Sequence, residues 1–185
     1  IWRSLVGSEM CIRDSLRSAE AILRRERRLR WRALDMGCGS AILGLGLLKA
    51  RPGTMLVAAD NDILAVTTAA ENARINHLPP LRVKAVLSQG YADPAVRRRA
   101  PYDLIFANIL AGPLFAMARD QMAALAPHGW LVLSGILNQH KWIPLYALGG
   151  STGLQVSFFL APVDEALISS DGTNTYSQSY QLEDC

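Results

Sequence analysis

The chain has 185 residues, of which 50% are apolar and 19% are charged. This composition excludes a disordered or low-complexity protein, and the length is that of one domain of ordinary size. No apolar run approaches the roughly 20 residues that a membrane-spanning helix requires, so we expect a globular domain with no membrane contact.

Basic residues are concentrated at the N-terminal end. Residues 1–32 hold nine arginines and four acidic residues, which gives a net charge of +5. The other 153 residues hold ten basic and twelve acidic residues, a net charge of −2. The basic character therefore belongs to the N-terminal segment, and the rest of the chain is mildly acidic.

The cysteines and histidines are sparse and unpatterned. Cys11, Cys38 and Cys185 are odd in number, widely spaced and without a CxxC motif. A disulfide framework is therefore not expected, and the cysteine usage favours a reduced, cytoplasmic chain. The three histidines show no ligand spacing, so we expect no metal site.

The N-terminal segment divides into two parts. Residues 1–15 show no clear periodicity and no signal-peptide pattern, and they resemble a translated adaptor, so we predict a non-native or disordered leader. Residues 16–31 predict a basic helical linker that ends near Trp31. The six arginines of Arg24–Arg32 could make a weak contact with RNA, but a solvated helix face or a linker to an upstream domain is the favoured interpretation.

Residues 32–185 alternate short apolar strands with helical segments, which is the signature of a parallel sheet. We expect strands at Arg32–Met36, Met55–Ala59, Leu81–Leu87, Tyr102–Ala107, Trp130–Ser134 and Leu154–Leu160. We expect helices at Ala41–Ala50, Leu64–Asn76, Pro113–Leu125 and Asn138–Leu148, with the Arg97–Arg99 triplet in a loop. The pattern predicts one α/β domain with a doubly wound, mostly parallel, Rossmann-like sheet, whose ligand binds at the carboxyl ends of the strands.

Small and polar residues follow three of these strands. The segment Asp35-Met36-Gly37-Cys38-Gly39-Ser40 ends the first strand, Asp60 ends the second, and Asn108 ends the fourth. Glycines permit a tight turn, and the N–H groups of the next helix favour an anionic group. Asp60 is suited to accept hydrogen bonds from both hydroxyls of a ribose. These residues predict a site for a nucleoside-containing cofactor.

The glycine spacing separates two such cofactors. The GxGxxG fingerprint of nicotinamide enzymes would require a glycine where Ile42 stands. The run Gly37-Cys38-Gly39-Ser40-Ala41 is closer to the GxGxG loop of adenosylmethionine enzymes, with Ala41 in the last glycine position. S-adenosyl-L-methionine is therefore the expected cofactor, and NAD is the weaker alternative.

Each of these residues also has a structural interpretation. Gly37 and Gly39 serve as turn glycines, Asp60 caps a helix together with Asp62, and Asn108 caps the segment that follows it. The coincidence of all of them at strand ends favours the functional interpretation.

The remaining polar residues near the loop are expected to support it. We expect the Asp35 carboxylate to accept hydrogen bonds from loop amides and to take no part as a base. We count Asp35 and Cys38 among the cofactor-binding residues of this loop, and no neighbour of Cys38 would activate its thiol. Asn72 and Asn76, four residues apart on one helix, are interpreted as structural.

Four stretches of the sequence are more specific: LDMGCGSAILGLGLLKA, AADNDILAVTTAAENARIN, YDLIFANILAGPL and APHGWLVLSGIL. Together they resemble the class I methyltransferase domain of the PrmA family, over roughly residues 32–150. The tetrapeptide Ala107-Asn108-Ile109-Leu110 is the most telling, because relatives that methylate nucleobases or glutamine usually carry Asn-Pro-Pro and an aromatic residue there.

The resemblance implies methylation of amino groups, on a lysine side chain or the N-terminus, of the eleventh protein of the large ribosomal subunit. It implies that Gly37 and Gly39 line the methionine moiety and that Asp60 holds the ribose. Asn108 would help to hold the cofactor and orient the acceptor amine, as the one catalytic residue. Ser88–Gly90 would flank the adenine.

A lysine amine must lose its proton before it attacks, against a reference pKa of about 10.4. Apolar surroundings lower that pKa, and Ile109, Leu110 and Pro113-Leu114-Phe115 are expected to supply them.

The sequence departs from the family pattern in several places. The N-terminal recognition domain and the Trp-containing final strand are not recognisable, and Ala41 replaces a glycine. We therefore expect a fragment that carries the catalytic domain. Two alternatives remain: an RNA or small-molecule methyltransferase on the same fold, and a cofactor-binding fragment that transfers no methyl group.

Overall fold

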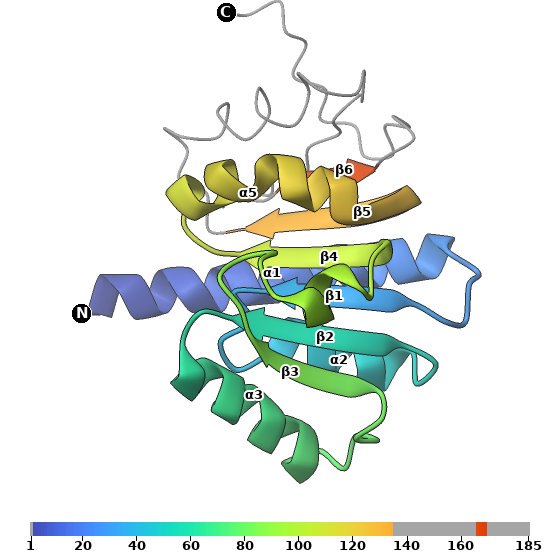
Figure 1. Ribbon diagram of the computed structural model, residues 1–185, viewed down its shortest axis with the longest axis horizontal. Helices are drawn as coiled ribbons and strands as arrows, with labels where there is room; N and C mark the ends of the chain where they lie inside the picture. The colour runs from blue at the N-terminus through green and yellow to red at the C-terminus, as the bar shows by residue number, and fades with distance from the viewer. Residues whose placement is uncertain (1, 135–165, 170–185) are drawn as a thin grey trace, which may run out of the picture.

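The computed structural model describes residues 2–134 and 166–169. In this part of the chain one sheet has the strand order β3-β2-β1-β4-β5-β6 (Figure 1). The strands are β1 Arg32–Met36, β2 Met55–Asp60, β3 Val83–Leu87, β4 Tyr102–Asn108, β5 Leu125–Ser134 and β6 Ala166–Ser169. The helices are α1 Trp2–Arg25, α2 Ile42–Ala50, α3 Ile63–Ile75, α4 Pro94–Arg97 and α5 Ala111–Ala124.

The sheet confirms the predicted doubly wound α/β fold. Strands β1 to β5 pair in parallel, and β6 pairs antiparallel with β5. The strand order reverses direction between β1 and β4, the point where a doubly wound sheet opens a crevice at its carboxyl ends. In Figure 1 these carboxyl ends lie on the left, together with the start of α1.

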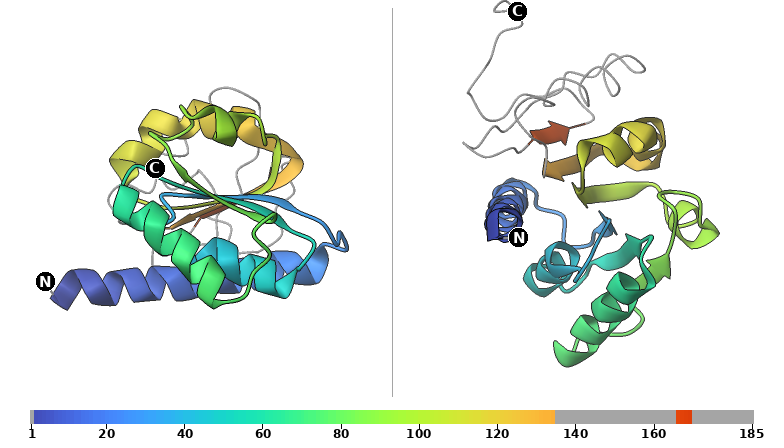
Figure 2. Two further views of the ribbon diagram at one scale, coloured as in Figure 1. Left: turned by 60° about the horizontal axis from the view of Figure 1, so that its bottom comes forward. Right: turned by 90° about the vertical axis from the view of Figure 1, so that its left-hand side faces the viewer.

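Helices cover both faces of the sheet, with α4 and α5 on one face and α1, α2 and α3 on the other (Figure 2). On the first face Leu34, Val57 and Ile105 of the strands pack with Val96 of α4 and Leu114 of α5. Because both faces are covered, β4 can be the near-continuous apolar run that the sequence shows.

The opposite face buries the alternate residues of the same strands. Ala33 of β1 and Phe106 of β4 pack with Ile22 of α1, Leu45 of α2 and Ala69 of α3. Side chains alternate between the two faces along a strand, so Asp35, two residues after Ala33, also points toward α2.

The N-terminal segment differs from the prediction. A single helix, α1, runs through the expected boundary between residues 15 and 16 and ends at Arg25, before Trp31. Trp31 is fully buried and its indole Nε1 donates to the Arg28 carbonyl at 3.1 Å. The helix ends before Trp31 because the Trp31 side chain is buried in the core directly before β1.

Two further elements were not predicted. The short helix α4 begins at the N-cap Asp93, whose carboxylate accepts the Ala95 N–H, and it takes Arg97 out of the expected loop. The antiparallel strand β6 adds an edge to the sheet. The expected helix at 138–148 and strand at 154–160 lie outside the described residues. No helix among the described residues is long and apolar enough to cross a membrane.

Candidate cofactor site

The carboxyl ends of β1, β2 and β4 lie side by side. Met36, the last residue of β1, is in register with Ala59 of β2 on one side and Ala107 of β4 on the other. Asp60 and Asn108 each follow one of these partners, so they flank the loop that begins at Gly37. The structure thus brings together the three strand ends that the sequence singles out.

The loop after β1 is held to the end of β2 by backbone hydrogen bonds. The N–H groups of Gly37 and Cys38 both donate to the Ala59 carbonyl, at 2.8 and 3.1 Å. The Gly39 N–H donates to Asp60 Oδ2 at 2.9 Å. The loop and the Asp60 carboxylate therefore form one unit, fixed before any ligand arrives.

The Asp60 carboxylate keeps acceptor capacity beyond these contacts. Its second oxygen, Oδ1, accepts the Asp62 N–H at 3.0 Å, while Asp62 caps α3 through the Leu64 N–H at 2.8 Å. Asp62 alone is therefore the N-cap of α3, and Asp60 accepts N–H groups from the two loops beside it. Each carboxylate oxygen still has room for another donor, because it can accept about two hydrogen bonds.

Asp35 is buried beneath α2. Its Oδ2 accepts the Gly44 N–H of the helix at 2.9 Å, which corrects the expectation that loop amides would be its partners. Burial raises the pKa of Asp35 from 3.8 to about 7; the Gly44 hydrogen bond opposes the rise and the nearby Asp60 charge adds to it. This carboxyl group supports the helix behind the loop.

The two loop glycines differ in what surrounds them. A Cβ on Gly37, at φ +66°, would overlap Cγ2 of Ile109. A Cβ on Gly39, at φ +51°, would meet no atom within 4 Å. Ala41 adopts the same left-handed backbone at φ 58°, so an alanine is tolerated there. Gly37 is therefore required by packing, whereas Gly39 leaves an open side on the loop.

Cys38 is not a nucleophile in this setting. Its thiol is buried, and burial, followed by the charges of Asp35 and Asp60, raises its pKa far above the ordinary value. The thiol therefore stays protonated and acts as part of the wall of the loop.

Asn108 lies half-buried at the end of β4, in register with Ser134 of β5. No hydrogen bond joins its side chain to the residues that the structure describes. Of the predicted apolar walls, Ile109 packs over Gly37 and Leu110 is 75% exposed. Leu114 does not contribute, because α5 turns it into the core.

A comparison with known protein families identifies the family of the chain that carries this loop. The family model of ribosomal protein L11 methyltransferase (PrmA) matches residues 8–143, which include the glycine loop, Asp60 and Asn108. The chain belongs to the PrmA family.

Curated members of the PrmA family match in sequence as well. The chain is 42% identical to the ribosomal protein L11 methyltransferase of Agrobacterium fabrum over 119 residues, which is 64% of this chain and 40% of that protein. It is 46% identical to the one of Brucella suis over 109 residues, 58% of this chain and 38% of that protein. The chain thus spans less than half the length of these relatives.

Solved structures show the same fold. A ribosomal protein L11 methylase from Lactobacillus delbrueckii superposes with a TM-score of 0.68 at 24% identity, over 82% of this chain and 74% of that one. The Thermus thermophilus 16S rRNA N2 G1207 methyltransferase superposes with a TM-score of 0.62 at 22% identity, over 76% of this chain and 37% of that one. The class I methyltransferase fold expected from the PrmA resemblance is confirmed.

Two contacts at the carboxyl edge of the PrmA sheet, one of them to the glycine loop, were not found from the sequence. The Asn72 amide of α3 donates to the Ser40 carbonyl at 3.0 Å and so fixes the end of the loop, which agrees with its structural interpretation. The buried Ser15 of α1 donates to Ser134 Oγ at 2.8 Å, across 119 residues of sequence, and ties α1 to the same edge. No local pattern could indicate the second contact. Among residues 2–134 and 166–169, no cluster of His, Cys, Asp or Glu could hold a metal.

Alanine at the two glycines is expected to separate folding from cofactor binding in this PrmA domain. Gly37→Ala should destabilise the fold by several kcal/mol, because it adds an overlap with Ile109 to backbone strain of about 1–2 kcal/mol. Gly39→Ala should cost only the strain, while its methyl group fills the open side of the loop and weakens adenosylmethionine binding. Urea unfolding and calorimetric titration measure the two effects. Equal losses of stability in both variants would contradict this assignment.

Asp35→Asn is expected to flatten the pH dependence of stability. The raised pKa means that the folded state holds a proton between pH 3.8 and about 7 that the unfolded chain releases. This contribution to the free energy of unfolding is fully present below pH 3.8 and is lost as the pH rises through about 7. At about 1.4 kcal/mol per pH unit, the free energy of unfolding changes by at most roughly 4 kcal/mol across this pH range.

An asparagine keeps the acceptor for the Gly44 N–H and cannot titrate. Relative to the unsubstituted chain, the Asp35→Asn variant should therefore gain stability as the pH is raised from near 4 to near 8. Urea unfolding at both pH values checks this, with Asp62→Asn as the exposed control that should show no such gain. Parallel pH profiles for the unsubstituted chain and Asp35→Asn would show that Asp35 is ionised throughout.

Proposed function

We propose that this chain carries the catalytic domain of an adenosylmethionine-dependent methyltransferase that methylates amino groups of ribosomal protein L11 in the cytoplasm. The observation that carries the proposal is the PrmA family match over residues 8–143, with the glycine loop, Asp60 and Asn108 converging at one sheet edge. The substrate is inferred from the relatives, which are ribosomal protein L11 methyltransferases.

The residues at this edge fit adenosylmethionine. Asp60 has acceptor capacity left for two ribose hydroxyls, and Gly39 leaves an open side on the loop for the methionine moiety. The N-cap Ala41 makes no side-chain hydrogen bond to α2, so backbone N–H groups of the first turn can receive the methionine carboxylate. When bound, the cofactor supplies a methyl group on a positively charged sulfonium.

The chain's own residues then act on the acceptor amine. The side-chain oxygen of Asn108 accepts a hydrogen bond from an N–H of the amine. This contact orients the lone pair of the amine nitrogen toward the methyl group. Ile109 and the half-buried Phe115 exclude water, which lowers the pKa of the amine and favours its neutral, attacking form. No side chain needs to serve as a strong base in this arrangement.

Two other functions are compatible with the fold. An RNA methyltransferase would gain from an aromatic residue after Asn108 on which to stack a base, and Ile109 and Leu110 stand there instead. A fragment that binds the cofactor without transferring a methyl group would leave the site intact and lack only substrate engagement.

The test is binding followed by transfer. Calorimetric titration with adenosylmethionine should show one site, and NAD should show none. Incubation with isotopically labelled adenosylmethionine and purified ribosomal protein L11 should label the protein on amino groups. Binding without labelling would identify a cofactor-binding fragment, and labelling of ribosomal RNA in place of the protein would favour the RNA enzyme.

A further inference from the structure

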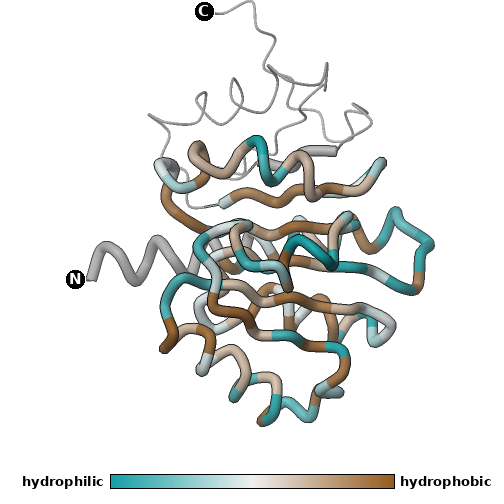
Figure 3. The backbone as a smooth tube through the Cα atoms, viewed as in Figure 1, coloured by the Kyte–Doolittle hydropathy of each residue, from teal (hydrophilic) through white to brown (hydrophobic). Residues whose placement is uncertain are grey.

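The edge of the sheet opposite the cofactor loop is strongly basic. We call it the amino edge and define it as the connections that lead into β1 to β4, with the adjoining ends of β1, α4 and β4: residues 26–32, 51–54, 79–82 and 97–103. Figure 1 shows these connections on the right, and Figure 3 shows the long connection before β1 as mainly hydrophilic. The amino edge holds nine arginines: Arg27, Arg28, Arg30, Arg32, Arg51, Arg82, Arg97, Arg98 and Arg99. Its acidic residues are Glu26 and Asp103.

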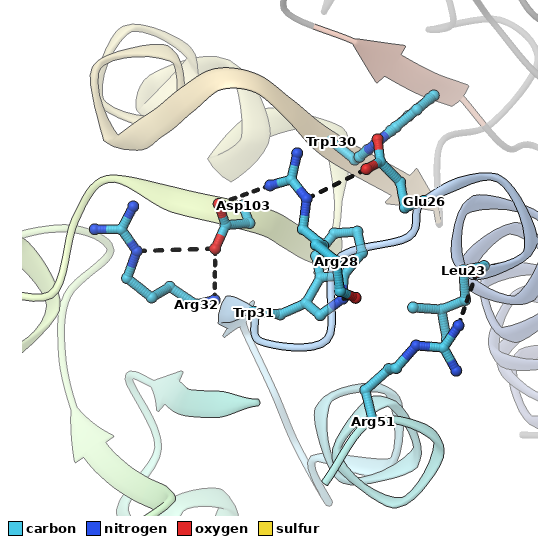
Figure 4. Close-up of polar contacts among 8 residues, drawn as sticks. All are labelled: Leu23, Glu26, Arg28, Trp31, Arg32, Arg51, Asp103 and Trp130. Atoms are coloured by element: carbon cyan, nitrogen blue, oxygen red, sulfur yellow. Dashed lines mark hydrogen bonds and ion pairs between the residues drawn. The ribbon is translucent and has the colours of Figure 1, made fainter. Parts of the chain in front are cut away.

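Both carboxylates of the amino edge are already engaged by the fold (Figure 4). Asp103 accepts Arg28 Nη1 at 2.8 Å and the backbone N–H of Arg32 at 2.7 Å. Glu26 accepts Arg28 Nε at 3.2 Å and the Trp130 indole N–H at 3.1 Å. Arg28 pairs with both carboxylates, and Arg32 Nε lies 3.8 Å from Asp103 Oδ2. Arg28 joins the connection to β4, and Glu26 joins it to Trp130 of β5.

Most of the other arginines lack a counter-charge. Within residues 2–134 and 166–169, no hydrogen bond or ion pair engages the side chains of Arg27, Arg30, Arg82, Arg97 or Arg98. Four of these are exposed and Arg82 is half-buried. They come from three separate connections, so the charge is gathered by the fold and not by one helix face.

The basic side chains surround a concave surface. Arg30, Arg32 and Arg82 line a hollow of about 650 Å³ together with Met55 and Leu81. The carboxylate in its lining, Asp103, is the one that Arg28 and Arg32 already occupy. A sulfonium cofactor would be repelled here, whereas an anionic chain would replace the missing counter-charges.

The basic residues of the amino edge are all arginines, and this indicates which kind of anionic partner the surface binds. The amino edge contains no lysine. A guanidinium is planar and binds a phosphate through two parallel hydrogen bonds, and it is less strongly hydrated than an ammonium group. We propose that the amino edge binds the phosphate backbone of RNA. RNA held there would leave the opposite edge free for the cofactor and the protein substrate.

Fluorescence anisotropy of a labelled RNA hairpin against the full chain tests the proposal over a series of KCl concentrations. The double variant Arg30→Gln/Arg82→Gln should weaken binding about tenfold or more at low salt. It should also reduce the slope of log affinity against log salt by about 2, one for each phosphate contact removed. The matched control, Arg74→Gln/Arg119→Gln, removes the same charge from α3 and α5 and should bind as the unsubstituted chain does.

Three results would overturn the proposal. The first is the absence of RNA binding at low salt, and the second is equal weakening of RNA binding by both double variants. The third is displacement of the labelled RNA by polyglutamate at the same concentration of negative charges at which unlabelled RNA displaces it. The last result would assign the surface to an acidic peptide. Circular dichroism and adenosylmethionine binding of each variant confirm that the fold is intact, and failure of methyl transfer alone would not affect the outcome.

Discussion

Asp60→Ala is expected to lower the affinity for adenosylmethionine by at least about 100-fold. In the proposed cofactor site the substitution removes the acceptor for two ribose hydroxyls, and a hydrogen bond to a charged group contributes roughly 1.5–3 kcal/mol. It also releases the Gly39 N–H, which Asp60 Oδ2 holds at 2.9 Å, so the loop loses its fixed shape. Calorimetric titration of the purified variant measures the loss.

The neighbouring Asp62 offers a control of the same charge. Asp62→Ala removes the cap of α3 and should cost about 1 kcal/mol of stability, with little change in cofactor affinity. Asp60→Asn should fall between the two, since its amide keeps one acceptor oxygen and presents a donor to the second hydroxyl. Unchanged affinity in Asp60→Ala would remove Asp60 from the cofactor site and leave it as a turn acceptor.

The strands and most helices could be predicted because each is decided by local pattern. β1 is predicted with its observed ends, and β4 extends only to Asn108 beyond the expected Ala107. β4 contains the continuous apolar run Leu104–Ala107, and β1 ends before Gly37, which breaks the strand. The convergence of Gly37, Asp60 and Asn108 followed from the fold class, because parallel strands end at one edge.

The end of α1, which the sequence analysis placed too late, depends on distant contacts. The course of the chain after α1 is decided by the burial of Trp31 and by the ion pair between Arg28 and Asp103, which are 75 residues apart. The predicted hydrogen-bond partners of Asp35 were the amides of the loop that follows β1, whereas the observed partner is the Gly44 N–H of α2. Alternation along β1 already places Asp35 on the face that α2 covers, so this contact was within reach of the sequence.

Asn108→Ala is expected to reduce methyl transfer by roughly 100- to 1,000-fold, the usual effect of removing one group that orients the reacting atoms. The affinity for adenosylmethionine should change only a few-fold, because Asp60 and the glycine loop remain. Single-turnover transfer to ribosomal protein L11 measures the first quantity, and calorimetric titration measures the second. Asn76→Ala, at the exposed end of α3, is the matched asparagine control and should remain active.

The variant Asn108→Asp keeps a hydrogen-bond acceptor at this position and adds a negative charge, so it separates the effects of the two. It keeps an oxygen at the same position, but a carboxylate next to the amine favours the ammonium form, which has no lone pair to attack with. We therefore expect Asn108→Asp to be as inactive as Asn108→Ala near neutral pH and to recover partly at higher pH, where the amine is neutral. Full activity of Asn108→Ala would exclude the orienting role. Loss of cofactor binding in both variants would instead make Asn108 a cofactor ligand, and the amine would then have to be oriented by backbone carbonyls at the end of β4.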